Sequence, residues 1–409
     1  MNLELRINPS RLSQRLDALG RLGATPEGGV SRLALSDADK LGRDQVVVWM
    51  KEIGLDVRVD QVGNLLGFRP GETDEAPVLF GSHVDSVRDG GRYDGAYGVL
   101  AALEVMQTLQ EARVGTRRPL AMVAFTNEEG ARYAPDMQGS LAFTGDLSVE
   151  EALAVTGFDG SHFGTELKRI GYTGDFSCAS VRPHAYVELH IEQGPLLEKE
   201  GVRIGAVEAI TGISWQEVTL RGAANHAGTT PMDLRHDAGF VAARVISYLR
   251  DLAAALGPAQ RATCGSIAFK PDVINVVPGE VKMTVDLRNT DEAVLRQAGE
   301  RLGAFIERAA KEEGVTAVAR QLVYVPPAQC DPGVVTVIEA AAAELGLSCR
   351  RMPSGAGHDA QILARHFPAA MIFIPSRGGV SHSPAEHSSP ENLAAGADVL
   401  LRTVVGLAK

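Results

Sequence analysis

Apolar residues in the first two hundred positions alternate between the spacing of helices, about 3.6 residues, and the short continuous runs of buried strands. Helices are predicted at residues 10–20, 36–54 and 98–112. Strands are predicted at residues 56–60, 64–68 and 77–81, and within residues 119–130. The alternation predicts an open α/β sheet, in which functional side chains gather where the strands end.

Between about residues 207 and 327 the pattern changes to that of a separate unit. Its expected order is strand, helix, strand, strand, helix and strand. These elements are predicted at residues 207–222, 233–256, 262–270, 280–288, 291–313 and 316–325. This order is typical of a two-layer α+β unit.

After a linker predicted at residues 325–332, the α/β pattern resumes. A helix, a strand and a helix are predicted at residues 334–346, 369–376 and 391–407. The sequence therefore predicts a discontinuous α/β domain made of residues 1–208 and 328–409. An α+β domain of residues 209–327 interrupts it.

Composition limits the classes of function. With 409 residues, 45% of them hydrophobic and 22% charged, the chain is long enough for two or three domains of about 100–200 residues. Its net charge of −11 has the wrong sign for binding a phosphate backbone, so nucleic acid is not an expected partner.

Neither a leader peptide nor a membrane span is expected. The first sixteen residues are interspersed with charges, and no stretch reaches the roughly 18 apolar residues that cross a bilayer. A cytoplasmic location is therefore expected. The cysteines lack CxxC spacing, which argues against a disulfide framework and a thiolate metal site. They are Cys178, Cys264, Cys330 and Cys349.

Five side chains of metal-binding type stand in short segments that contain glycine. They are His83, Asp94, Glu129, His190 and His382. Two divalent cations held about 3.5–4 Å apart need one carboxylate between them, with imidazoles and carboxylates on each side. Asp94 is the predicted bridge. The set indicates a two-metal hydrolase, and such a site accepts Zn²⁺, Mn²⁺, Co²⁺ or Ni²⁺.

The adjacent pair Glu128 and Glu129 follows a predicted buried strand. One carboxylate can bind metal while the other takes a proton from a metal-activated water and passes it to the leaving nitrogen. The residues alone leave the order of these roles open. Asp85, two residues after His83, is expected to orient the His83 ring through its second nitrogen.

Several of these segments together resemble the hydantoinase/carbamoylase family of binuclear metal-dependent amidohydrolases. The segments are GSHVDS, DGAYGV, TNEEGAR, HIEQGP, NHAGTTPMDLRHDA, DLRNTD, SGAGHDA and SHSPAEH, and the resemblance runs from about residue 20 to residue 407. The family contains N-carbamoyl-L-amino acid hydrolases and allantoate amidohydrolases. It is related to the metal-dependent aminoacylases and carboxypeptidases.

The resemblance implies that one metal ion is held by His382 and Glu129. It assigns the second ion to His83 and His190, with Asp94 between the two ions. In the carboxypeptidase relatives a carboxylate commonly stands at the position of His190. The imidazole at this position therefore favours the amidohydrolase branch.

The resemblance also favours Glu128 as the general base and two divalent ions per subunit, with zinc the first expectation. It implies that residues 209–327 form a lid and dimerisation domain of a homodimer. In such a dimer His226, with Asn275, would reach the metals of the neighbouring subunit. A monomer whose lid covers its own site is the alternative.

Five residues are candidates for binding a substrate that carries a carboxylate and a ureido or amide group. His226 can stabilise an oxyanion, Asn275 and Gln193 offer amides to the ureido group, and Arg288 offers a planar fork to an α-carboxylate. Gly357 can present a backbone N–H to that carboxylate. Both residues also have a structural interpretation. Arg288 could be an exposed charge at the end of a strand, and Asn275 could belong to a turn before Pro278.

The remaining histidines are expected to be structural. They are His162, His184, His236, His366 and His387. His358, in the glycine-rich segment SGAGHDA, is left open between a functional role and the anchoring of a tight turn.

The expected reaction is metal-dependent hydrolysis of the carbamoyl C–N bond of an N-carbamoyl-L-amino acid, giving the L-amino acid, ammonia and carbon dioxide. Allantoate hydrolysis is the nearest alternative. Further alternatives are a dipeptidase or aminoacylase, and a binding protein without activity on the same fold. Because Glu128 and all five candidate ligands are present, the sequence favours an enzyme.

Overall fold

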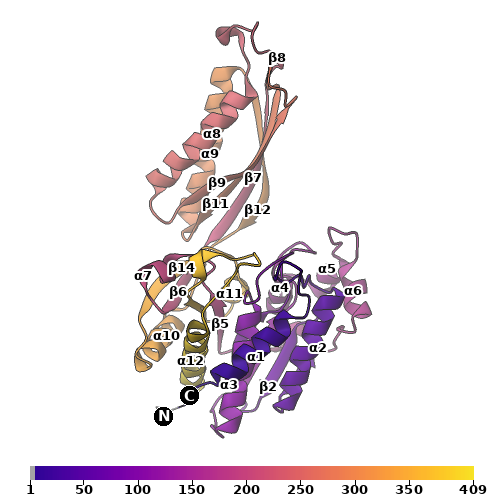
Figure 1. Ribbon diagram of the computed structural model, residues 1–409, viewed down its shortest axis with the longest axis vertical. Coiled ribbons are helices and arrows are strands. Elements are labelled where there is room, and N and C mark those ends of the chain that lie inside the picture. Colours follow the sequence, from indigo (N-terminus) through magenta and orange to yellow (C-terminus); the bar gives the residue numbers. More distant parts are fainter. Residues whose placement is uncertain (1–4) are drawn as a thin grey trace. The chain divides into compact units, whose positions relative to one another are not determined.

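The computed structural model describes residues 5–409 (Figure 1). Residues 1–4 lie outside the described residues. The prediction that the first domain begins at residue 1, and the prediction that the chain starts without a leader peptide, both concern these residues. The chain divides into two compact units. The first contains the chain up to Glu208 and from Gln329 onward, and the second contains Ala209–Ala328.

The first unit is built on a nine-stranded sheet in the order β1-β2-β4-β3-β5-β15-β6-β13, with β14 paired to β6. Its strands are β1 (Asp56–Val59), β2 (Leu65–Arg69), β3 (Val78–His83), β4 (Leu120–Phe125), β5 (Ala185–Ile191), β6 (Ile204–Ile210), β13 (Ala328–Gln329), β14 (Cys349–Ser354) and β15 (Ala369–Ile374). The four neighbours β4, β3, β5 and β15 are parallel to one another. Their side chains are all buried, which agrees with their apolar runs.

Helices cover this sheet. Those of the first unit are α1 (Pro9–Gly20), α2 (Asp37–Glu52), α3 (Ala96–Glu111), α4 (Gln138–Thr144), α5 (Val149–Ala154), α6 (Phe163–Arg169), α7 (Leu196–Glu200), α10 (Pro332–Glu344), α11 (Asp359–Leu363) and α12 (Pro390–Leu407). The helices α3 and α12 pack against each other and against the central strands. Both are apolar on nearly all sides, so they bury most of their residues. No helix within residues 5–409 is long and apolar enough to cross a membrane.

The second unit has an antiparallel sheet in the order β12-β7-β11-β9, with two long helices side by side on one face (Figure 1). Its elements are β7 (Gly212–Arg221), β8 (Asn225–His226), α8 (Ala238–Leu256), β9 (Arg261–Lys270), β10 (Val276–Val277), β11 (Glu280–Asn289), α9 (Glu292–Glu313) and β12 (Thr316–Val325). Alternate residues of β7 and β11, including Val218, Leu220, Met283 and Leu287, form a core with both helices. The side chains between them face away from the helices.

The mixed α/β fold and most predicted elements are confirmed, and three local predictions are wrong. The single strand predicted at residues 207–222 is two strands, β6 and β7, that belong to different sheets. The helix predicted from residue 233 begins at Ala238, because Asp237 caps it by accepting bonds from two backbone N–H groups. The predicted linker 325–332 contains β13 and the start of α10.

Gly81, in the central strand β3, meets a neighbouring strand too closely for any side chain. Its φ is +153°, and a Cβ atom would lie 1.9 Å from the backbone oxygen of Val123 in β4. We expect Gly81→Ala to lower the free energy of unfolding by about 3 kcal/mol or more, because the strands must separate. Gly303→Ala is the control, since it lies in α9 with no atom within 4 Å of an added Cβ. Urea denaturation of both variants measures the effect, and equal stability would contradict the close approach.

Candidate metal centre

The predicted metal ligands lie at the carboxyl ends of the parallel strands. His83 is the last residue of β3, and His190 is the second-to-last residue of β5. Glu129 follows β4, and His382 follows β15. Because these four strands are parallel, their carboxyl ends meet at one edge of the sheet. Asp94 stands just before α3, beside the same edge.

Asp94 lies between two groups of possible ligands. Its Oδ1 is 3.1 Å from His190 Nε2 and 3.7 Å from His83 Nε2. Its Oδ2 is 3.2 Å from His382 Nε2, which is 3.4 Å from Glu129 Oε2. Within each group the ligand atoms lie within 4.8 Å of one another. The structure thus brings the five predicted side chains together in two groups that share Asp94.

The donor set fits divalent cations. Two buried atoms of the cluster residues, His83 Nε2 and Glu129 Oε1, have no hydrogen-bond partner among the described residues. Burial, together with neighbouring carboxylates, raises the pKa of both Glu128 and Glu129 well above the usual value. A bound cation would relieve both features, because it accepts imidazole nitrogen and carboxylate oxygen and offsets negative charge.

Asp85 supports the cluster differently from the prediction. His83 Nδ1 lies 3.0 Å from the backbone oxygen of Asp85, whereas the Asp85 carboxylate is 3.9 Å away. That carboxylate instead accepts bonds from the backbone N–H groups of Glu128 and Glu129, each at 3.3 Å. Asp85 therefore orients the His83 ring through its main chain and holds the Glu128–Glu129 segment through its side chain.

Glu386 is a buried residue of the site that the sequence analysis did not single out. Its Oε1 accepts bonds from the backbone N–H groups of Tyr93 (2.9 Å) and Asp94 (3.2 Å), and its Oε2 accepts one from the Ser381 hydroxyl (2.8 Å). It therefore joins the Asp94 segment to the His382 segment. The available signal was its place in SHSPAEH, four residues after His382.

Gln193, predicted to bind the substrate, contacts Asp94 directly. Its Nε2 donates to Asp94 Oδ2 at 2.9 Å and to Ser381 Oγ at 3.2 Å. Gln193 and His382 have φ values of +56° and +52°, a conformation that side chains other than glycine rarely adopt. Such backbone strain is typical of functional sites.

His358 is buried beside the cluster and has an anchoring contact. Its ring centre is 4.6 Å from that of His190, and its Nε2 is 3.0 Å from Ser354 Oγ. His358, His190 and Glu188 form a third possible ligand group. The Glu188 oxygens already accept bonds from the Ser82 hydroxyl and from the Ala360 N–H, so this group has less unmet bonding capacity than the other two. The contact with Ser354 favours the anchoring interpretation of His358.

Gly357 lies between β14 and α11, in the first unit. A Cβ atom there would lie 2.5 Å from the Met137 side chain, so a larger residue does not fit without a shift. The Met137 side chain therefore lies close to the Gly357 backbone. The predicted contact between the Gly357 N–H and the substrate would likewise need a residue without a side chain.

The other predicted substrate residues belong to the second unit. His226 in β8 pairs with Val276 in β10, and Asn275 O accepts a bond from the Ala227 N–H. His226 Nδ1 accepts from the N–H groups of Gly228 and Thr229, which places the remaining ring proton on Nε2. His226 and Asn275 thus share one tip of this unit.

Arg288 lies on the face of the second unit's sheet that faces away from the helices. Its Nε and one terminal nitrogen bind the Asp286 carboxylate at 3.0–3.1 Å. The guanidinium is therefore already oriented by a carboxylate of its own strand. This pairing was not predicted, although both residues stand in the segment DLRNTD.

Three of the histidines expected to be structural make local contacts. His366 pairs with Asp146 at 2.9 Å, His236 Nδ1 lies 3.0 Å from the backbone oxygen of Glu313, and His162 lies 3.2 Å from Thr156 Oγ1. These contacts agree with the expectation for these three.

Comparison with known proteins identifies the family. The pattern of Peptidase family M20/M25/M40 matches residues 79–405. An N-carbamoyl-L-amino-acid amidohydrolase of Rhizobium meliloti is 40% identical over 405 residues, which cover 99% of this chain and 97% of the relative. An allantoate amidohydrolase of Bacillus subtilis (strain 168) is 37% identical over 400 residues, which cover 97% of both chains. A crystal structure of an amidase of the hydantoinase/carbamoylase family from Burkholderia multivorans has a TM-score of 0.97 at 43% identity, covering 99% of this chain and 98% of that one.

The chain therefore belongs to peptidase family M20/M25/M40, whose members are in general metal-dependent. The resemblance to hydantoinase/carbamoylase amidohydrolases is confirmed by full-length relatives and by the fold. The predicted enzyme class, a hydrolase of amide-type C–N bonds, is confirmed with it.

We expect Glu386→Ala to weaken metal binding by about 10–100-fold, because the Asp94 and His382 segments lose their common anchor. Glu344→Ala, an exposed carboxylate in α10, is the control. Competition of each protein with a fluorescent chelator measures metal affinity. If Glu386→Ala and the control bind metal equally well, Glu386 has no role in holding these segments together.

Proposed function

We propose that this protein hydrolyses the carbamoyl C–N bond of an N-carbamoyl-L-amino acid. One water is consumed, and the L-amino acid, ammonia and carbon dioxide are released. The observation that carries the proposal is the pair of ligand groups sharing Asp94, with Glu128 Oε2 only 3.4 Å from His83 Nε2. The full-length similarity to a protein named for this activity supports it.

In this proposal the first ligand group is His83, His190 and Asp94, and the second is Asp94, Glu129 and His382. Bound divalent cations, zinc or alternatively manganese, cobalt or nickel, would polarise the carbamoyl oxygen and lower the pKa of water. The tight spacing around Asp94 supports a count of two ions, because one carboxylate presents a separate oxygen to each group.

Glu128 acts as the general base in the proposed reaction. Its carboxylate is buried at the edge of the cluster, and its backbone is fixed by Asp85. From this place it takes the proton of the attacking water and delivers it to the leaving nitrogen. Glu129, whose Oε2 points at His382, is the ligand of the pair.

Five residues bind the substrate in this proposal. Arg288 receives the α-carboxylate as a planar fork that Asp286 has already oriented. Asn275 and Gln193 bind the ureido group, and Gly357 adds a backbone N–H. His226 donates its Nε2 proton to the oxyanion, which agrees with the two backbone bonds to its Nδ1.

We further propose that the second unit is a lid and dimerisation domain of a homodimer. Its sheet has two edge strands, β9 and β12, and one face without helices. Exposed apolar side chains stand near His226, among them Met232, Leu234 and Ile274. Unpaired edges and exposed apolar surface are commonly covered by a second copy in symmetric dimers. In this proposal His226 acts in the neighbouring subunit.

Allantoate is the second candidate substrate, because an allantoate amidohydrolase matches the chain over its full length. Both substrates carry a ureido group and a carboxylate. A panel that measures ammonia release from N-carbamoyl-L-amino acids, their D-enantiomers, allantoate, N-acyl amino acids and dipeptides separates the candidates. Fastest release from an N-carbamoyl-L-amino acid supports the proposal, and fastest release from allantoate replaces it.

Replacement of Glu128 by Gln should lower kcat by at least about a hundredfold, because proton transfer is lost while the shape is kept. Metal content, measured by atomic emission, should stay unchanged, because Glu128 is not a proposed ligand. Glu344→Gln, an exposed position in α10, is the control. A Glu128→Gln enzyme with unchanged kcat would remove Glu128 from the role of general base.

Arg288→Lys should raise KM by about tenfold or more, because a point charge replaces a fork that binds a carboxylate through two parallel bonds. Arg320→Lys is the matched control, since Arg320 also pairs with a carboxylate of this sheet, Glu217. Steady-state kinetics on both enantiomers of the best substrate tests the change. An unchanged KM in Arg288→Lys would contradict the proposed binding of the α-carboxylate by Arg288. Equal rates of the wild-type enzyme on the two enantiomers would also contradict it.

Mixing inactive His226→Ala and inactive Glu128→Gln subunits should restore activity, because one site of each mixed dimer then has both groups. Random mixing predicts about a quarter of the wild-type activity. Each variant mixed with itself is the control, and native mass spectrometry reports whether subunits exchange. If mixed dimers form and remain inactive, His226 acts within its own chain.

A further inference from the structure

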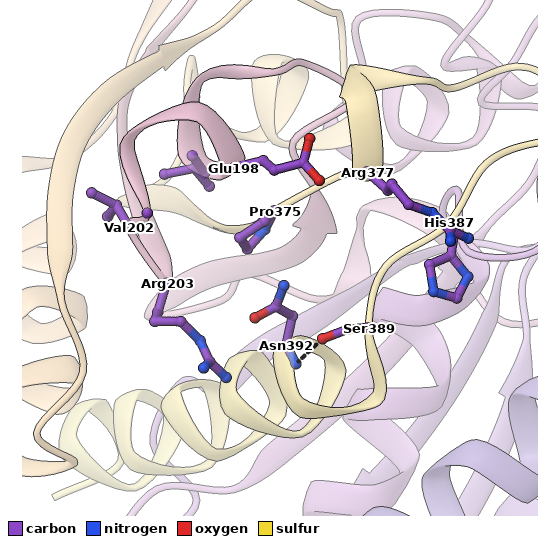
Figure 2. A pocket seen from close by; sticks show the side chains of 10 residues that line it. Glu198, Val202, Arg203, Pro375, Arg377, His387, Ser389 and Asn392 are labelled. Carbon is purple, nitrogen blue, oxygen red and sulfur yellow. Dashed lines mark hydrogen bonds between the residues drawn. The ribbon is translucent and has the colours of Figure 1, made fainter.

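Arginine side chains hold irregular segments of this protein by donating to backbone oxygens. At the pocket shown in Figure 2, Arg203 lies beside the start of α12 and donates to Glu391 O at 3.0 Å. Such a bond joins a charged donor to a backbone acceptor, and it fixes the segment that carries the acceptor. In the second unit Arg235 makes two bonds of this kind to the loop that carries His226.

This loop, residues 226–237, has little apolar support. His226, at its start, pairs with Val276 of β10. Farther along, the side chains of Met232 and Leu234 are 76% and 63% exposed. Neither belongs to the core that the sheet forms with α8 and α9. The shape of the loop therefore depends on hydrogen bonds.

Arg235 joins two points of this loop. Its Nε donates to Thr230 O at 3.1 Å, and a terminal nitrogen donates to Ala227 O at 2.6 Å. The two acceptors stand on either side of Gly228 and Thr229. The guanidinium group therefore closes residues 227–230 into a turn of fixed width.

The closed turn holds the His226 ring. The N–H groups of Gly228 and Thr229 donate to His226 Nδ1 at 3.1 and 3.2 Å, and the Thr230 hydroxyl donates to His226 O at 2.8 Å. A Cβ atom at Gly228 would lie 3.3 Å from the ring, so the backbone folds closely against it. The orientation of the ring thus depends on the same residues that Arg235 spans.

The main chain of Arg235 is itself attached to the two long helices. The next residue, His236, lies with its Nδ1 3.0 Å from Glu313 O at the end of α9, and its backbone oxygen accepts from the Ala223 N–H at 2.9 Å. Asp237 then caps α8. From this fixed position the Arg235 side chain reaches back to the loop.

We infer that Arg235 is a positioning residue that fixes the His226 ring, and with it the direction of Nε2. Its effect on catalysis rests on the proposed function, in which that nitrogen donates to the oxyanion. The planar fork of arginine holds both carbonyls at once, whereas a lysine would offer one point charge to two acceptors. Without the fork the turn opens, Nδ1 loses its two donors, and Nε2 is no longer directed.

A double-mutant cycle on the full-length, metal-loaded enzyme tests the inference with the best substrate. Arg235→Ala should lower kcat by about tenfold or more with little change in KM, because an oxyanion donor acts in the transition state. In enzyme that already has His226→Ala, adding Arg235→Ala should lower the residual kcat by less than about twofold, because the ring that it positions is gone. Arg235→Lys should fall between wild type and Arg235→Ala. Arg221→Ala, which breaks the pair with Glu280 in the same unit, is the matched control and should keep the wild-type kcat.

Hydrogen exchange followed by mass spectrometry gives a readout that does not depend on activity. Arg235→Ala should speed exchange at residues 228–230 by about tenfold or more, while α8 and α9 exchange as in wild type. Arg221→Ala should leave the loop unchanged. Unchanged loop exchange in Arg235→Ala would overturn the inference, and so would faster exchange throughout the second unit. A kcat loss from Arg235→Ala that is equally large with and without the His226 ring would also overturn it, because Arg235 would then act on another group.

These outcomes are distinguishable from failure of the proposed function. If allantoate is the best substrate, the proposed substrate is wrong, and the cycle measured on allantoate supports or overturns the role of Arg235 by the same criteria. If His226→Ala keeps full kcat, the proposed role of His226 fails, while faster loop exchange in Arg235→Ala still supports Arg235 as the residue that fixes the ring. If hydrolysis of N-carbamoyl-L-amino acids depends on His226 but not on Arg235, the function stands and the inference fails.

Discussion

Asp94 places its two carboxylate oxygens 3.1 Å from His190 and 3.2 Å from His382, and this sharing of one anion constrains the whole site. Imidazoles and carboxylates are crowded at the carboxyl edge of four parallel strands, and of the five proposed ligands all but His382 have buried side chains. Buried carboxylates repel one another unless cations or hydrogen bonds offset them. The neighbouring elements therefore hold Asp94 in place: Gln193 donates to its side chain, and Glu386 accepts from its backbone.

The support beneath the site is built from main-chain contacts and buried ion pairs. Asp85 holds the Glu128–Glu129 backbone, and its own carbonyl orients His83. Nearby, Arg43 and Asp39 form a fully buried pair at 2.7 Å, and Arg43 also donates to the Gly63 carbonyl and the Thr126 hydroxyl. Removing one partner of such a pair is strongly destabilising, because the other charge is left buried. Catalytic geometry and stability thus depend on the same strand ends.

Much of this could be predicted from the sequence, and the remainder has physical reasons. Apolar periodicity located the helices and central strands, and the type and spacing of His83, Asp94 and His382 indicated a shared cluster. The split between β6 and β7 was missed, because an alternating pattern continues through the single residue between them. The contacts of Glu386 and the pairing of Arg288 with Asp286 depend on side-chain geometry, which residue spacing does not encode. The short helices α4 to α7 contain too few turns to produce a clear period.

The central claim is that Asp94 serves two cations at once. Metal titration by calorimetry, with emission spectroscopy for stoichiometry, tests it on wild-type protein and on Asp94→Ala, with circular dichroism confirming that the variant is folded. The account predicts two tightly bound divalent ions per chain in the wild type and loss of the paired site in the variant, because no other carboxylate lies in both ligand groups. Two equally tight ions in folded Asp94→Ala would contradict it.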